Sequence, residues 1–197
     1  MQAAGLTGAG VKVAVLDSGI DYTHKNMGGL GTAAAYAAAT LNPNVIPAGL
    51  YPTAKVIGGY DFTGSVWPNG PRSEDPNPID DGPEGGHGTH VADIIGGKSQ
   101  DGSHVGVAPG ALLYAVKVCS SVSTSCNGEA IIKGLDWIVD PNGDLDFSDA
   151  ADVVNLSLGS SYGQREDDST LAVSNVVRFG IVAAISAGNS ADRPFIV

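Results

Sequence analysis

Residues 11–19 read VKVAVLDSG, a short and nearly continuous apolar run that stops at an aspartate, a serine and a glycine. A run of this length, rich in β-branched residues, is typical of a strand buried on both faces of a parallel sheet. Later runs at residues 55–57, 111–118, 152–158 and 181–185 have the same apolar character. The sequence therefore predicts a strand at each of these places, with an edge strand at residues 55–57.

Helical patterns separate the expected strands. Residues 88–95 follow a glycine-rich loop, residues 129–139 show helical apolar spacing, and residues 169–179 end before Gly180, as is typical of a helix C-terminus. An alanine-rich patch at residues 33–39 predicts a short surface helix. Strands that alternate with helices predict an α/β fold of three layers, a doubly wound and mostly parallel sheet with helices on both faces.

Composition narrows the class of protein. The 197 residues hold 10 Lys and Arg against 21 Asp and Glu, a net charge of −11. This acidity argues against a nucleic-acid partner, which needs a basic face, and no apolar run is long enough to span a membrane. A hydrophobic content of 43% supports a packed core in one domain. Residues 28–54 form a long insertion in that domain, and residues 68–86 form a polar, acidic surface loop.

Parallel sheets bind ligands just beyond the carboxyl ends of their strands. The residues that follow the expected strands are therefore the candidates for a functional site. They are Asp17 after the first strand, Cys119 and Ser120 after the third, residues 157–159 after the fourth, and residues 186–189 after the fifth.

Asp17 and His87 have the chemistry of an acid–base pair, although each also has a plainer interpretation. A carboxylate directly after a buried strand needs a hydrogen-bond donor, and alone it favours a structural Asx turn on the backbone of Gly19. His87 opens a helix between glycines, where the positive end of the helix dipole disfavours a protonated imidazole. Zinc is an alternative for His87 and His90, but the glutamate of a zincin motif is missing between them. We expect His90 to be a packed helix histidine.

Asn189 ends the stretch SAGN. Its amide is either part of a turn or a donor beside Asp17 and His87, as an oxyanion hole requires. Two other stretches, GKS at residues 97–99 and GSSYG at residues 159–163, resemble parts of a phosphate-binding loop and of a hydrolase nucleophile elbow. Neither motif fits, because the first stretch ends a helix and no histidine follows the second.

Residues 140–146, DPNGDLD, place side-chain oxygens at alternate positions, as a calcium loop does. Leu145 stands where an EF-hand has a glycine, and no acidic residue follows at the last ligand position. We expect a solvated acidic turn here, with a structural calcium ion as the alternative.

Four motifs in a fixed order carry a family resemblance. They are VAVLDSGI at residues 13–20, HGTHVA at residues 87–92, VNLSLG at residues 154–159 and AGN at residues 187–189. Together they resemble the subtilisin-like serine proteases, and the resemblance covers nearly the whole chain. The insertion and the last residues are most similar to the larger secreted subtilases, in which a protease-associated domain interrupts the catalytic domain soon after the Asn motif.

The resemblance implies a role for each matching residue. Asp17 would orient the imidazole, His87 would be general base and then general acid, and Asn189 would donate to the oxyanion. Residues 123–125, which include Ser125, would pair with an extended substrate as a strand. The walls of the primary side-chain pocket would be Ser157, Leu158 and Gly159 on one side and Ser186, Ala187 and Gly188 on the other.

The same resemblance implies a secreted serine endopeptidase that acts on protein or peptide substrates and needs no cofactor for its chemistry. The signal and pro-segment of such a protein are not recognised in this chain. A disulfide between Cys119 and Cys126 is also implied, whereas their spacing alone leaves two free thiols equally open. Asn26 and the short loop at residues 98–106 depart from the family pattern, because related enzymes often bind calcium with an aspartate in place of this asparagine.

The largest departure concerns the nucleophile. The family's serine lies in a Gly-Thr-Ser-Met-Ala helix start after the Asn motif, and residues 1–197 contain no such stretch. We therefore expect the N-terminal part of one catalytic domain, truncated before its nucleophile, that is inactive alone and self-associates through apolar surface. The alternatives are a non-catalytic, subtilase-like peptide-binding module and a nucleotide-binding α/β protein.

Overall fold

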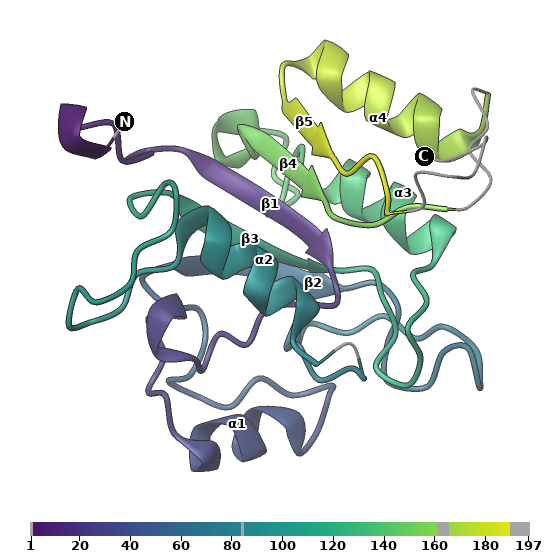
Figure 1. Ribbon diagram of the computed structural model, residues 1–197. Coiled ribbons are helices and arrows are strands. Elements are labelled where there is room, and N and C mark those ends of the chain that lie inside the picture. Colours follow the sequence, from purple (N-terminus) through teal and green to yellow (C-terminus); the bar gives the residue numbers. More distant parts are fainter. Residues whose placement is uncertain (1, 84, 161–165, 190–197) are drawn as a thin grey trace.

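The computed structural model describes residues 2–83, 85–160 and 166–189 (Figure 1). Every predicted strand and helix is present. The strands are β1 (Lys12–Asp17), β2 (Val56–Asp61), β3 (Leu112–Lys117), β4 (Val153–Leu156) and β5 (Val182–Ile185). The helices are α1 (Ala33–Thr40), α2 (His87–Gly96), α3 (Gly128–Trp137) and α4 (Asp168–Phe179), with short 3-10 helices at Gln2–Ala4, Lys25–Met27 and Phe147–Asp149. In this described part of the chain, no helix has the length and apolar character needed to cross a membrane.

The strands form one parallel sheet in the order β2-β3-β1-β4-β5, so β2 is an edge strand as predicted. β1 lies at the centre, with β3 on one side and β4 on the other. The chain therefore changes its direction of travel across the sheet at β1. Doubly wound sheets bind ligands at such a switch point, beyond the carboxyl ends of the strands. Asp17 stands at that end of β1, in register with Lys117 of β3.

Alternate side chains of β1 serve two separate cores. Val13 and Val15 pack in the core that contains Ala92 of α2. Ala14 and Leu16 point to the opposite face, where the core contains residues of α3 and α4. Figure 1 shows α2 on one face of the sheet and α3 and α4 on the other. This arrangement confirms the predicted three-layer α/β fold.

Side chains cap most of the helices. The N-terminal N–H groups of α1, α3 and α4 are bound by the side chains of Thr32, Asn127 and Asp167. α4 ends at Gly180 with φ 118°, as its sequence predicted. α2 differs, because it starts after Gly86, which has φ 86° and no side chain to cap the helix. Another segment must supply that cap.

The loop at residues 68–86 is less exposed than predicted. Asp75, Asn77 and Asp80 are among the buried polar residues of the protein. Buried polar groups need hydrogen bonds, and each of these three side chains makes at least one. Asp75 Oδ1 accepts from the Asn77 N–H at 2.9 Å, and the Asn77 amide donates to the carbonyl oxygen of Ala39 at 2.8 Å. The prediction of a surface loop is therefore wrong for these three residues.

Candidate active site

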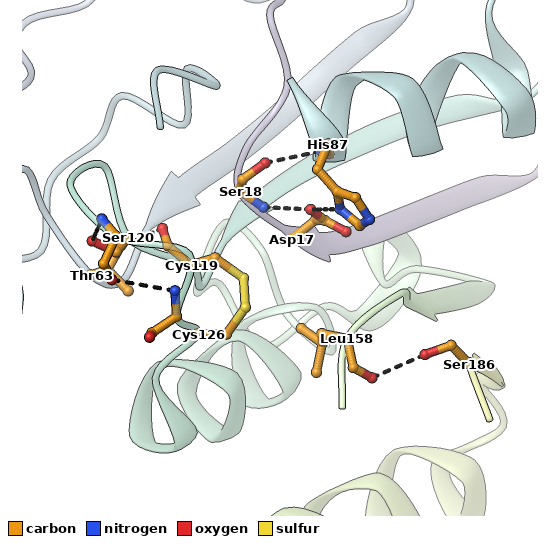
Figure 2. Close-up of a disulfide and its surroundings, with 12 residues drawn as sticks. Asp17, Ser18, Thr63, His87, Cys119, Ser120, Cys126, Leu158 and Ser186 are labelled. Carbon is orange, nitrogen blue, oxygen red and sulfur yellow. Dashed lines mark hydrogen bonds and ion pairs between the residues drawn. A yellow bond between two sulfur atoms is a disulfide. The ribbon is translucent and has the colours of Figure 1, made fainter. Parts of the chain in front are cut away.

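Asp17 and His87 meet at the carboxyl end of β1 (Figure 2). Asp17 is the last residue of β1 and is 2% exposed, and His87 is the first residue of α2. His87 Nδ1 lies 2.7 Å from Asp17 Oδ1, which also accepts the Ser18 N–H at 2.8 Å. The Asx turn on Gly19 is therefore not the observed arrangement. The carboxylate is bonded to the imidazole instead.

Glycines allow α2 to approach β1 closely enough for this contact. A Cβ on Gly88 would lie 2.2 Å from the carbonyl oxygen of Gly19 and 3.1 Å from Asp17 Oδ1. The Gly88 N–H also donates to Ser18 Oγ at 2.9 Å, which ties the first turn of α2 to the end of β1. A larger residue at position 88 would push the helix away and separate His87 from its carboxylate.

Asp80 supplies the cap that Gly86 lacks. Its Oδ2 accepts from the Thr89 N–H at 3.0 Å and from the Thr89 hydroxyl at 2.7 Å, so it binds the first turn of α2. Burial raises the pKa of Asp80, while its hydrogen bonds to Thr89 oppose that rise. Asp80 is not predicted as a site residue from the sequence, because an acidic residue in a polar loop carries no signal of burial.

His87 combines a bonded ring nitrogen with a partly exposed side chain. Nδ1 is bonded to Asp17, and the side chain as a whole is 43% exposed. An imidazole oriented by a bond at Nδ1 and accessible at its surface has the chemistry of a proton carrier. His90 is exposed, so the prediction of a packed histidine is wrong. Among the residues that the structure describes, no group of three or more His, Cys, Asp or Glu side chains is placed to hold a metal.

The two predicted pocket walls lie next to each other. The Ser186 N–H donates to the carbonyl oxygen of Leu156 at 3.0 Å, and the Ser186 hydroxyl donates to that of Leu158 at 3.1 Å. Ser186 is therefore bonded both to the last residue of β4 and to Leu158 in the other predicted wall. Ser157 Oγ accepts from the Asn155 amide at 3.0 Å. Asn189 follows these residues and is exposed, and no hydrogen bond joins it to the described acid–base pair.

Residues 119–126 form a disulfide hairpin beside Asp17 (Figure 2). The disulfide between Cys119 and Cys126 confirms the pairing that the family resemblance implied. The Ser120 N–H donates to the carbonyl oxygen of Ser125 at 2.9 Å, which closes the hairpin. The Cys119 N–H lies 3.2 Å from the carbonyl oxygen of Asp17, so the hairpin starts directly beside the acid–base pair.

The loop at residues 140–146 is an acidic turn closed on its own backbone. The Asp140 carboxylate accepts the N–H groups of Gly143 at 2.9 Å and Leu145 at 3.0 Å. Asp144 Oδ1 accepts the Asp146 N–H at 2.8 Å. These oxygens already have donors in the turn, which is the arrangement expected without a cation. Calcium binding by this loop stays a prediction.

The loop at residues 98–106 does not offer the donor set of a calcium site. The Asn26 amide donates to Asp93 Oδ1 at 2.9 Å, and His104 Nε2 lies 2.8 Å from Asp93 Oδ2. The Gln2 amide donates to the carbonyl oxygen of Gly106 at 2.7 Å. Calcium needs several oxygens that are free to converge on it. Here N–H groups occupy those oxygens, so the residues present do not fit the ion.

Comparison with known proteins finds a match to one protein family over most of the chain. The model of the Subtilase family matches residues 8–195. Subtilisin E of Bacillus subtilis is 34% identical over 189 residues, which cover 96% of this chain and 37% of that protein. The major intracellular serine protease of the same species is 30% identical over 192 residues, with 98% and 47% covered.

Solved structures agree with the sequence matches. A protease from Pseudoalteromonas arctica superposes with a TM-score of 0.68 at 26% identity, over 95% of this chain and 52% of that one. The chain spans 37% of subtilisin E and 51% of a subtilisin of Bacillus pumilus. With nearly its whole length matched, this chain belongs to the subtilase family.

Proposed function

We propose that this chain carries the acid–base part of the active site of a serine endopeptidase. The observation that carries the proposal is the bond of 2.7 Å between His87 Nδ1 and the buried Asp17 carboxylate at the switch point of the sheet. Homology to serine proteases supplies the reaction class, because the matched relatives are subtilisins.

The roles follow from the geometry of this pair. Asp17 fixes the ring of His87 and stabilises its charged form, so that the other nitrogen takes a proton from the nucleophile and returns it to the leaving amine. Asn189 follows β5 at the same end of the sheet and is proposed to stabilise the oxyanion with its side-chain amide. No cofactor is needed for these steps.

The substrate is proposed to be an extended stretch of protein or peptide. Residues 123–125 of the disulfide hairpin would pair with it, and the adjoining segments at residues 157–159 and 186–188 would hold its side chain. The bond from Ser186 to Leu158 at 3.1 Å supports a joint wall, because it holds the two segments together. Main-chain pairing of this kind gives affinity without a strict sequence requirement.

The nucleophile is proposed to come from sequence other than residues 1–197. These residues contain no Gly-Thr-Ser-Met-Ala stretch, and a triad without its serine loses most of its catalysis. We expect the 197-residue chain alone to be inactive. The full-length protein is proposed to be secreted, since the Cys119–Cys126 disulfide suits an oxidising compartment, and to carry a protease-associated domain.

Labelling with a fluorophosphonate probe tests the function. The full-length gene product should be labelled at one serine and should cleave an unfolded protein, and His87→Ala should abolish both. The 197-residue chain should not be labelled. Labelling of any serine in this chain would overturn the assignment of the nucleophile. A full-length protein that binds peptides but is neither labelled nor active would favour the non-catalytic peptide-binding module.

A further inference from the structure

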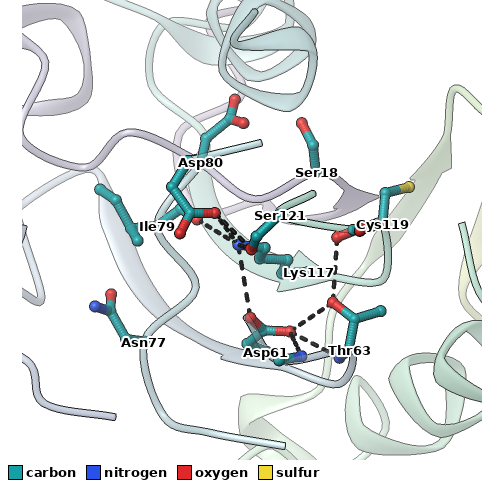
Figure 3. Close-up of polar contacts among 12 residues, drawn as sticks. Ser18, Asp61, Thr63, Asn77, Ile79, Asp80, Lys117, Cys119 and Ser121 are labelled. Atoms are coloured by element: carbon teal, nitrogen blue, oxygen red, sulfur yellow. Dashed lines mark hydrogen bonds and ion pairs between the residues drawn. The ribbon is translucent and has the colours of Figure 1, made fainter. Parts of the chain in front are cut away.

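Lys117 is the last residue of β3, and its side chain is only 1% exposed. An ammonium group has three N–H donors, and each of them has a partner here. The partners are the carbonyl oxygen of Ile79 at 3.1 Å, Ser121 Oγ at 2.7 Å and Asp81 Oδ1. Figure 3 shows Lys117 with Ile79 and Ser121, which come from two different loops. Lys117 therefore joins the loop at residues 79–81 to the disulfide hairpin.

The loop at residues 79–81 precedes α2, the helix that begins with His87. Asp80, between the two partners of Lys117, caps α2 through Thr89 at 2.7 Å and 3.0 Å. Pro78, which stands just before this loop, accepts the Ile20 N–H at 3.0 Å through its carbonyl oxygen. One side of the Lys117 cluster is thus attached to the helix that begins with His87.

The other side of the cluster is attached to the disulfide hairpin twice. Ser121 Oγ accepts from Lys117 and donates to Asp81 Oδ1 at 2.7 Å, which closes a triangle of three side chains. Asp61 Oδ2 lies 3.6 Å from the ammonium, and Asp61 Oδ1 lies 2.8 Å from the Thr63 hydroxyl. That hydroxyl is also 3.1 Å from the carbonyl oxygen of Cys119. The hairpin is therefore bonded to this cluster at Cys119 and at Ser121.

A buried ion pair is poor evidence for stability. Removing Lys117, Asp61 and Asp81 from water costs about as much as their attraction returns, and apolar residues of similar volume often serve as well. Such a cluster supplies a defined geometry, because each hydrogen bond is made only when its donor and acceptor lie in a narrow range of positions. Here the geometry that it defines is the distance between the start of α2 and the disulfide hairpin.

We propose that Lys117, together with Asp81 and Ser121, positions the disulfide hairpin relative to His87, so that the strand offered to a peptide has one fixed place. The positioning of the hairpin rests on the contacts above. Its consequence for peptide binding rests on the proposed function, and the two parts are tested separately.

Hydrogen exchange tests the positioning in the 197-residue chain. Ser121→Ala removes the hydroxyl that joins Lys117 to the hairpin and leaves the buried charges paired. We expect exchange of the Ser120 and Asn127 amides, which close the hairpin, to become about tenfold faster, the effect of losing one or two hydrogen bonds. Ser121→Thr, which keeps the hydroxyl, should restore protection. The matched control Ser174→Ala on α4 should leave these amides unchanged.

Coupling distinguishes positioning from a general loss of stability. Asp81→Asn should also speed exchange in the hairpin, and Ser121→Ala added to it should have little further effect, because both remove the same link. Exchange that rises equally in β1, or that stays unchanged in the hairpin, would overturn the proposal. Lys117→Met is the harsher variant and we expect it to unfold the chain, since it leaves the buried Asp61 and the partly buried Asp81 without their cation.

The consequence for function is read in the full-length gene product. Ser121→Ala should raise KM for an extended peptide severalfold while kcat and the rate of fluorophosphonate labelling stay close to wild type. Labelling depends on the triad alone, whereas KM depends on the hairpin. A fall in labelling equal to the rise in KM would contradict the proposal. If the wild-type protein is not labelled at all, the proposed function fails while the exchange result still decides the positioning.

Discussion

The two sides of the sheet differ in how completely they are covered. Around the switch point, β1 and β3 lie between two helical layers, and Val15 and Val116 are 0% exposed. At the far edge, β5 is just as apolar, yet Val182 is 62% and Ile185 47% exposed. Sheets made of parallel strands are normally covered on both faces, so the first region is in its usual environment and the second is not.

The residues of the candidate site are divided between these two regions of the sheet. Asp17 and His87 belong to the covered region, where packing and close glycine contacts leave one arrangement for the pair. The pocket walls and Asn189 extend from β4 and β5 at the uncovered edge. There the structure joins Ser186 to Leu158 but does not bring Asn189 to the pair. The part of the site that lies on well-packed strands has a defined geometry, whereas the part at the uncovered edge is not brought to the acid–base pair.

The largest effect expected in the covered region is that of Asp17→Asn. The amide cannot hold the His87 tautomer that the carboxylate holds, so proteolysis by the full-length protein should fall about 10⁴-fold. The measurement is kcat on an unfolded protein substrate, with circular dichroism to confirm the fold. A loss below tenfold would mean that His87 does not depend on this contact.

Gly88→Ala should break the same contact through sterics. The new Cβ would lie 2.2 Å from the carbonyl oxygen of Gly19, and overpacking of this kind costs about 3 kcal/mol. The control is Gly128→Ala at the start of α3, where a Cβ meets nothing within 4 Å and should leave stability unchanged or slightly higher. Urea unfolding of both variants measures the difference. Equal stabilities would show that α2 can move away from β1 at no cost.

Asp75→Asn should reveal a buried carboxylate that opposes folding at neutral pH. Burial raises the pKa of Asp75 from 3.8 to about 6, against the hydrogen bond from Asn77. A raised pKa means that this group favours the folded state below pH 3.8, and that the benefit is lost as the pH rises through about 6. The amide avoids that loss, so the variant should be more stable than wild type at pH 7.5, by at most about 3 kcal/mol.

The pH dependence is the readout for Asp75. The stability advantage of the variant, measured by urea unfolding, should shrink as the pH falls to 4.5. Asp136→Asn, an exposed change on α3, serves as the matched control and should keep the wild-type profile. An advantage of Asp75→Asn that is the same at all pH values would contradict the assignment.

Much of the covered region could be predicted from the sequence, for local reasons. Apolar runs and helix-ending glycines are short-range signals, and the motifs around Asp17 and His87 place both residues at strand and helix ends. The buried polar residues Asp75, Asp80 and Lys117 could not be predicted. Their burial depends on donors and acceptors from distant segments, and neither a polar loop nor a lysine at the end of a strand shows in its sequence whether such partners exist.

Self-association tests the uncovered edge. Within the described residues β5 is the last strand of the sheet, and its edge and its exposed valine should bring chains together at micromolar concentration. Val182→Lys should shift the mass measured by light scattering towards the monomer of 19.8 kDa. Val107→Lys is a matched control, since Val107 is 66% exposed but lies in a loop away from the edge. A wild-type chain that is monomeric throughout would show that the β5 edge does not drive association.

The smallest expected effect is that of calcium. The loop at residues 98–106 is bonded to α2, with His104 Nε2 on one oxygen of Asp93 and the Asn26 amide on the other. We therefore expect the melting temperature to be the same in millimolar calcium and in a chelator. Asn26→Asp sharpens the test, because a second carboxylate facing Asp93 should lower the melting temperature in the chelator and create a rise with calcium. A rise in the wild type that Asp144→Ala abolishes would instead place a calcium ion in the loop at residues 140–146.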